Sequence, residues 1–257
     1  MSDLRITTIQ STLQWEDIPA NLSHFTHLFA GLEGQTDLVV LPEMFSTGFS
    51  MNPAQLAEPM EGPTIGWMRE QAVRLGAALC GSLIIEEEGK YYNRLVWMDA
   101  EGNSEVYDKR HLFGLGGEAK DYAAGNQRLI VDYKGWKICP LICYDLRFPV
   151  WSRNTEAYDL LIYLANWPKP RASAWRTLLR ARAIENQAYV IGVNRIGEDG
   201  SGLSYRGDTA VIDFMGEALY QVSYQEDVFT TSLSYADMHA LRKKLPFLAD
   251  RDHFDLR

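Results

Sequence analysis

Short apolar runs alternate with amphipathic stretches along nearly the whole chain, and this alternation is the strongest constraint on its fold. Runs rich in Val, Ile and Leu are typical of buried strands, whereas apolar residues spaced three or four apart indicate helices. We predict strands at 4–10, 38–41, 77–85, 92–98, 106–107, 129–133, 137–142, 160–164, 190–193, 209–214, 218–220 and 228–233, and helices at 21–32, 63–75, 172–186 and 235–244. This order predicts a layered α/β fold in which helices cover the faces of the sheets.

The same pattern indicates how the chain is organised. Each half begins with a strand followed by a helix, so two stacked sheets with helices outside would account for both halves. No repeat, low-complexity tract or long Pro/Gly/Ser linker divides the sequence, and we expect one domain over residues 1–257. The glycine-rich stretch 113–125 is expected to be a long loop. Such loops in compact domains are usually functional, which makes it the candidate lid over a pocket.

Composition excludes several classes of function. The net charge of −9 argues against nucleic acid or an anionic membrane as the main partner, because both attract clustered positive charge. The sequence has no charged-then-apolar leader, so secretion is not expected. It also has no unbroken apolar stretch of about 18 residues, so membrane spanning is not expected. The three cysteines, Cys80, Cys139 and Cys143, fit a reducing cytoplasm better than a disulfide scaffold.

Cys143 is placed where an α/β enzyme would hold a reactive group. It follows the apolar strand 138–142 directly, and polar and turn-forming residues after it suggest a tight elbow. Ligands of open α/β sheets gather beyond the carboxyl ends of strands, and a stiff strand would hold the thiol in place. Taken alone, the stretch also fits a buried core cysteine. Cys139 lies four residues earlier rather than in a C-x-x-C pair, and no histidine cluster is near, so a zinc site is not expected.

Three charged residues are candidates for catalysis, although each could be a solvated surface group. Glu43 follows the second strand in LVVLPEMF, much as Cys143 follows its own strand, and could serve as a general base. Lys109, in VYDKRHLF, could favour a thiolate and bind a developing oxyanion. Glu118 lies in the glycine-rich loop, where a carboxylate is usually exposed, but it could orient Lys109 or a water molecule.

Other residues could shape a pocket or supply a base. Asn166 and Trp167 follow another strand and could line a pocket or serve only in packing. Cysteine nucleophiles are commonly paired with histidine. Of the five histidines, only His111 is near a candidate site, two residues from Lys109. A base other than histidine is therefore favoured.

Taken together, LPEMF, YDKRHLF and ICYDLRFP, in that order, resemble the nitrilase superfamily of carbon–nitrogen hydrolases over nearly the whole chain. Within it, GGEAKDYAAGN, LANWP and RARAIENQAYVIGVNRIG are similar to the small omega-amidase branch, which deamidates 2-oxoglutaramate and 2-oxosuccinamate. The resemblance implies a four-layer αββα sandwich of two mixed sheets with helices outside. It also implies a homodimer formed through helices near the cysteine elbow.

The resemblance also implies the catalytic roles. Glu43 would be the base, Lys109 the oxyanion binder, Cys143 the nucleophile and Glu118 the second glutamate found in many members. We assign the backbone N–H of Tyr144 as a further oxyanion donor. The expected enzyme is a cysteine-dependent amidase that releases ammonia through a thioester and needs no metal or organic cofactor.

The carboxylate of a 2-oxo acid amide would need a local positive group, for which Arg171 and Lys169 are candidates. Three other hypotheses remain. The chain could hydrolyse a nitrile, an N-carbamoyl compound or a different amide. It could be an inactive binding protein on the same scaffold. It could also be a redox or metal protein built on Cys139 and Cys143.

Overall fold

The computed structural model describes residues 2–254, and within them the strands form two mixed sheets. The first sheet contains, in spatial order, β13 (Asp227–Leu233), β1 (Leu4–Gln10), β2 (Leu38–Val40), β3 (Ala78–Glu87), β4 (Lys90–Met98) and β5 (Ser104–Asp108). The second contains β10 (Ile196–Glu198), β11 (Ser204–Ile212), β9 (Tyr189–Asn194), β8 (Leu160–Ala165), β7 (Trp136–Ile142) and β6 (Val131–Tyr133), with β12 (Ala218–Ser223) paired to β11.

The centre of each sheet is parallel and its margins are antiparallel. β1, β2 and β3 run parallel in the first sheet, and β7, β8 and β9 run parallel in the second. Parallel neighbours bring their carboxyl ends to one edge of a sheet. Glu43 therefore follows β2 at one such edge, while Cys143 and Asn166 follow β7 and β8 at another.

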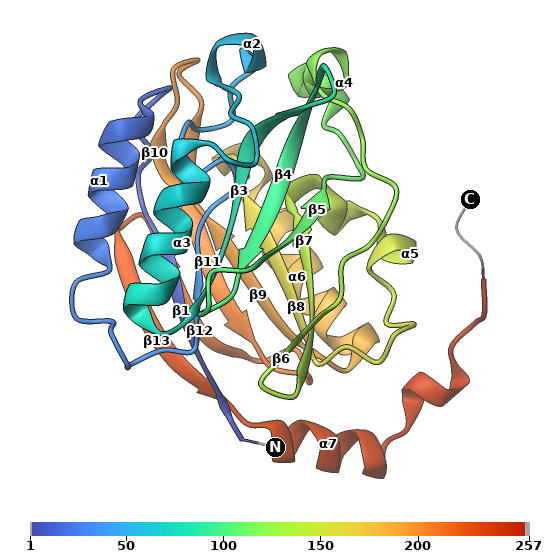
Figure 1. Ribbon diagram of the computed structural model, residues 1–257. Coiled ribbons are helices and arrows are strands. Elements are labelled where there is room, and N and C mark those ends of the chain that lie inside the picture. The colour runs from blue at the N-terminus through green and yellow to red at the C-terminus, as the bar shows by residue number, and fades with distance from the viewer. Residues whose placement is uncertain (1, 255–257) are drawn as a thin grey trace.

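Helices cover the outer face of each sheet, as Figure 1 shows. α1 (Ile18–Leu28) and α3 (Pro63–Leu75) pack on the first sheet through a core that includes Phe25 and Met68, and α6 (Ala172–Asn186) contacts β9 and β11 of the second. Side chains from both sheets share one further core between them. The predicted four-layer αββα sandwich is confirmed.

β3 and β4 form one hairpin and β6 and β7 another, and their turns explain why they form. The β3–β4 turn places Glu88 and Gly89 at φ of 51° and 73°, and the β6–β7 turn places Lys134 and Gly135 at 51° and 85°. Positive φ at both central residues matches the twist of the flanking strands, and glycine tolerates it at the second position.

The helix predicted at 21–32 instead spans 18–28. Asp17 caps its first turn by accepting a hydrogen bond from the Ala20 amide at 3.0 Å, and Pro19 suits the first turn because it needs no donor there. The chain then turns through Gly31 and Gly34, both at positive φ. The helical spacing of apolar residues continues beyond the end of the helix because Leu32, in the following turn, packs into the same core.

Most other boundaries were predicted more closely, although β11 begins at Ser204 rather than at 209, and the short elements were missed. The helices at 63–75, 172–186 and 235–244 (α7, Tyr235–Lys244) are confirmed, whereas the strand predicted at 129–133 begins only at Val131. The expected loop 113–125 contains η1 (Gly114–Gly116) and α4 (Glu118–Asp121). Elements this short show no periodicity in the sequence; the others are α2 (Pro53–Leu56), α5 (Pro149–Ser152), η2 (Cys143–Arg147), η3 (Lys169–Arg171) and η4 (Phe247–Asp250).

Among residues 2–254, no helix combines the length and the apolar character needed to cross a membrane. All three cysteines are unpaired and buried.

Candidate active site

Glu43 is delivered to the interior by the chain that leaves β2. Its neighbours stay hydrogen-bonded to β3, since the Leu41 amide donates to Cys80 O at 2.8 Å and the Met44 amide donates to Ser82 Oγ at 2.8 Å. The Glu43 side chain is fully buried. Such a carboxylate needs donors on both oxygens, because burial without them is costly.

Three donors meet the Glu43 carboxylate. Oε1 accepts from Lys109 Nζ and Asn93 Nδ2, both at 2.8 Å, and Oε2 accepts from the Asn166 amide at 2.7 Å. Asn166 Nδ2 also donates to the Glu43 carbonyl at 2.6 Å. The strand ends of both sheets therefore hold the same carboxylate, and it is not the solvated loop acid that was the alternative.

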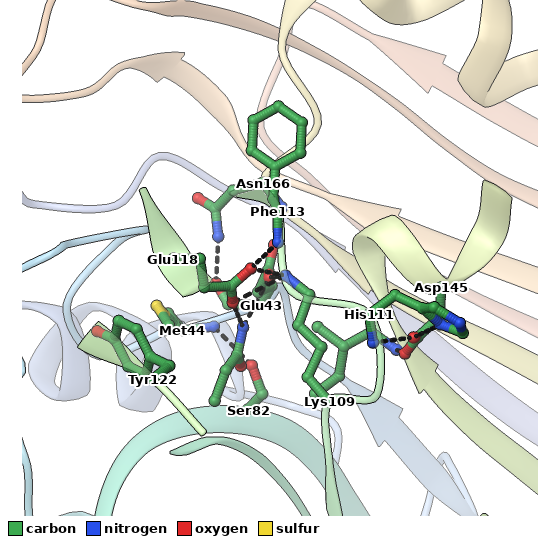
Figure 2. Close-up of polar contacts among 12 residues, drawn as sticks. Glu43, Met44, Ser82, Lys109, His111, Phe113, Glu118, Tyr122, Asp145 and Asn166 are labelled. Carbon is green, nitrogen blue, oxygen red and sulfur yellow. Dashed lines mark hydrogen bonds and ion pairs between the residues drawn. The ribbon is translucent and has the colours of Figure 1, made fainter. Parts of the chain in front are cut away.

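Lys109 lies between two glutamates directly after β5. Its ammonium contacts Glu43 Oε1 at 2.8 Å and the two Glu118 oxygens at 3.0 and 2.9 Å, as the dashed lines in Figure 2 show. The side chain is fully buried. Burial alone would lower the pKa of Lys109, but Glu118 and Glu43 outweigh it and raise that pKa. Lys109 therefore stays an ammonium at neutral pH.

Glu118 is buried, contrary to the usual exposure of a loop carboxylate. α4 turns its side chain inward, where Oε2 accepts from the Phe113 amide at 2.6 Å in addition to Lys109. Burial raises the pKa of Glu118, with Lys109 opposing and Glu43 adding to the rise. The chain from 113 to 121 thus forms part of the site wall.

Cys143 sits on a strained elbow after β7. Its φ is 42°, an unusual value for a residue other than glycine, and its side chain is 9% exposed. Asp145 braces the elbow: Oδ2 accepts from the Ile142 amide at 3.1 Å and from Tyr107 Oη at 2.7 Å, and Oδ1 accepts from the His111 amide at 3.0 Å. The His111 ring also contacts Asp145, with Nδ1 2.8 Å from Oδ1, so both the backbone and the side chain of His111 bind to the elbow.

The thiol of Cys143 is the protonated form at rest. Burial raises its pKa well above the usual range, and the Glu43 charge adds to this, whereas Lys109 opposes it. Lys109 taken alone lowers the pKa of Cys143, as expected from the sequence. The two carboxylates and burial prevail, so the sulfur needs a base to become a nucleophile.

A cavity of about 340 Å³ opens onto Cys143 and Lys109. Tyr144, Asn166, Trp167 and Arg171 line it, while Lys169 is exposed and does not. The walls are largely apolar and aromatic, and they include Trp15, Phe49, Met51, Phe113, Leu203 and Tyr205.

Sequence reasoning missed two residues of this site. Asn93 was hidden inside a strand, where its only signal was a polar residue among apolar ones in YYNRLVWM. Arg147, four residues after Cys143, also lines the cavity, with its guanidinium 4.9 Å from the Trp167 ring centroid. Between residues 2 and 254, no group of three or more His, Cys, Asp or Glu side chains is arranged to hold a metal ion.

Comparison with known proteins agrees with this geometry. The model of the carbon–nitrogen hydrolase family matches residues 5–243, and the chain belongs to that family. It is 46% identical over 257 residues to omega-amidase YafV of Escherichia coli (strain K12), covering all of both chains. It is 32% identical over 219 residues to 2-oxoglutaramate amidase of Bacillus subtilis (strain 168), covering 83% of this chain and 84% of that protein.

A solved structure supports the fold. XC1258 of Xanthomonas campestris, described as a CN-hydrolase superfamily protein with an arsenic adduct in its active site, superposes with a TM-score of 0.98. The two sequences are 48% identical, and each chain is covered completely.

Proposed function

We propose that this carbon–nitrogen hydrolase removes the terminal amide of a small 2-oxo acid amide such as 2-oxoglutaramate or 2-oxosuccinamate. The observation that carries the proposal is the cavity whose floor holds both the Cys143 thiol and Lys109, which is hydrogen-bonded to Glu43. The omega-amidase names of the relatives at 46% and 32% identity support the choice of substrate.

In the first half-reaction, Glu43 takes the Cys143 proton as sulfur attacks the amide carbon. The oxygen of that carbonyl becomes an anion, stabilised by the Lys109 ammonium and the backbone N–H of Tyr144. Tyr144 is near the start of η2, where amides have no partner within the helix. Glu43 then protonates the departing nitrogen, ammonia leaves, and the acyl group stays on sulfur as a thioester.

In the second half-reaction, Glu43 deprotonates water as its oxygen attacks the thioester. The C–S bond breaks, the carboxylic acid leaves, and the proton returns to the sulfur. The sum is amide plus water giving acid plus ammonia, with Glu43 acting as a base and then as an acid in each half-reaction. General acid–base catalysis of this kind contributes about 10²–10⁴-fold to the rate.

The acid end of the substrate is assigned to the two arginines of the cavity. Arg171 lies with its guanidinium 5.0 Å from the Phe113 ring centroid, and Arg147 lies over Trp167. Within residues 2–254, neither arginine forms a salt bridge. A guanidinium backed by an aromatic ring keeps donors free for a carboxylate. Of the two candidates from the sequence, Arg171 is therefore the preferred contact, because Lys169 does not line the cavity.

Ammonia release from a substrate panel tests this function. We expect turnover of 2-oxoglutaramate and 2-oxosuccinamate, weak turnover of neutral amides of the same length, and none of a nitrile or N-carbamoyl compound. Cys143→Ala and Cys143→Ser should each lower kcat by at least about a thousandfold with thermal melting nearly unchanged, because the nucleophile is lost.

Cys139→Ser is the matched control, since that thiol is buried in β7 away from the cavity. Full activity of Cys143→Ala would contradict the mechanism. Preference for a nitrile or N-carbamoyl compound would retain the mechanism and replace the substrate.

We also propose a cytoplasmic homodimer. Three unpaired thiols suit a reducing compartment. Val150 on α5 is 50% exposed and Ile184 on α6 is 56% exposed, so the helices beside the elbow carry the apolar surface that a dimer would bury. Sedimentation equilibrium measures the mass directly.

A further inference from the structure

Asn93 contacts both glutamates of the site from the middle of β4. Its Nδ2 donates to Glu43 Oε1 at 2.8 Å and to Glu118 Oε1 at 3.1 Å. Lys109 Nζ contacts the same two oxygens at 2.8 and 3.0 Å. The two carboxylates are thus joined by a charged bridge and by a neutral one.

The charge balance explains why a second bridge is needed. Two carboxylates and one ammonium, all fully buried, leave an excess negative charge. Like charges in one buried site disfavour each other's ionised form. A neutral donor shared by both oxygens stabilises the ionised pair without adding a charge that would need its own partner.

Asn93 would destabilise β4 if its side chain served only in packing. The side chain is fully buried, and within residues 2–254 its Oδ1 has no hydrogen-bond partner. An unsatisfied buried acceptor of this kind typically costs about 1–3 kcal/mol. Asn93 does not line the cavity, so contact with substrate does not account for it.

We propose that Asn93 is a positioning residue that fixes the Glu43 carboxylate between Lys109 and the nucleophile. The inference rests on the proposed role of Glu43 as base. Without Asn93, the only hydrogen-bond donor left to Glu43 Oε1 would be Lys109 Nζ. The same ammonium also binds both oxygens of Glu118. The carboxylate of Glu43 would then be less firmly aimed at the nucleophile.

The other titratable groups around Glu43 are the same in the wild type and in an Asn93 variant. They come from the segment after β5, from α4, from the segment after α4, from the elbow and from β11: Lys109, Glu118, Tyr122, Cys143 and Tyr205. A shift in the pH profile of an Asn93 variant therefore reports the loss of one donor.

Two assays on Asn93→Ala test the proposal. In steady-state ammonia release from pH 5 to 9, we expect kcat to fall about 10- to 100-fold, KM to change less than about twofold, and the acid limb to move up by about half a pH unit or more. In alkylation of Cys143 by iodoacetamide, followed by mass spectrometry, the pH profile should move in the same direction. Asn93→Ser, which keeps one short donor, should lie between the variant and the wild type.

Asn21→Ala is the matched control. Asn21 is equally buried, but its Nδ2 donates to the carbonyls of Gln14 and Ser46 rather than to carboxylates. It should lower the melting temperature and leave both pH profiles unchanged.

The outcomes separate the possible roles. Unchanged pH profiles in Asn93→Ala, with activity lost only in proportion to folded protein, would reduce Asn93 to a structural residue; Asn93→Ser decides the same point if Asn93→Ala does not fold. A shifted alkylation profile without turnover of any 2-oxo acid amide would support the role of Asn93 and overturn the proposed substrate.

Discussion

At the residue scale, the proposed oxyanion role of Lys109 cannot be separated from its ion pairs. Its ammonium faces the cavity, where an oxyanion would form, and it also neutralises Glu43 and Glu118. Breaking a buried ion pair by removing one partner is strongly destabilising, because the remaining charge is left without compensation. Loss of Lys109 should therefore reduce activity and stability together.

The first prediction is for Lys109→Met, which keeps the length of the side chain and removes its charge. We expect kcat to fall at least about a hundredfold and the free energy of unfolding to fall by roughly 3–5 kcal/mol at pH 7. The stability deficit should shrink as the pH is lowered toward 5, because protonation removes the uncompensated charge of the carboxylates.

Urea denaturation of the variant and the wild type at several pH values measures this difference. Lys90→Met, at an exposed position of β4, is the control for losing a lysine. A deficit that stays constant with pH would mean that the carboxylates are not the cause.

At the scale of elements, one wall of the cavity depends on a close approach between the β10–β11 turn and Trp15. A Cβ at Gly200 would lie 2.4 Å from Trp15 Nε1, closer than atoms can approach. Asp199 holds the turn by accepting from the amides of Ser201 and Leu203 at 2.9 and 3.0 Å. Trp15 must therefore move if Gly200 gains a side chain.

Gly200→Ala should accordingly raise KM several-fold with a smaller effect on kcat, because Trp15 lines the cavity while the reacting groups lie elsewhere. Steady-state kinetics on the preferred amide checks this. Gly202→Ala strains the same turn at a φ of 77° but meets nothing closer than 3.9 Å, so it should lower stability and leave KM unchanged. Equal KM changes in both variants would point to the turn rather than to Trp15.

Element ends were the part of the site that sequence could predict. Glu43, Lys109 and Cys143 each follow a recognisable strand, so their placement at strand ends could be read directly. The hydrogen bond from the Lys109 amide to the Asn93 carbonyl, at 3.1 Å, could not be predicted. It depends on the register that sets Arg94 opposite Asp108, and no local pattern encodes register between two strands. The burial of Glu118 was missed for a related reason, since α4 is a single short turn whose direction is set by tertiary contacts.

At the scale of the whole molecule, Asp37 ties the two sheets together. It precedes β2 and accepts hydrogen bonds from Arg5 on β1 and, at 2.5 Å, from Lys134 in the β6–β7 turn of the second sheet. Burial by itself would raise the pKa of Asp37, but the hydrogen bonds from Arg5 and Lys134 lower it to about 2, from an ordinary 3.8.

A folded-state pKa below the unfolded value stabilises the protein above about pH 4, and this stabilisation is lost as the pH falls toward 2. Asp37→Asn should therefore lower the free energy of unfolding by about 1–2 kcal/mol at pH 7, allowing for screening of the partly exposed cations, and by roughly half as much at pH 3. Melting of the variant and the wild type at both pH values measures this. Asp132→Asn, at an exposed site on β6, should change neither; an Asp37 effect equal at both pH values would exclude the ion pairs as its source.

Glu43 and the Asn166 amide that holds it are 123 residues apart, and they belong to different sheets. Glu43, the proposed base, and its partner Lys109 come from the first sheet, while the Cys143 sulfur comes from the second. A chain with only one half assembled would possess the proposed proton acceptor or the proposed nucleophile, never both. Recovery of turnover after dilution from denaturant therefore reports when the two sheets have stacked. Spectroscopic signals from one sheet alone would recover earlier, before the site is complete.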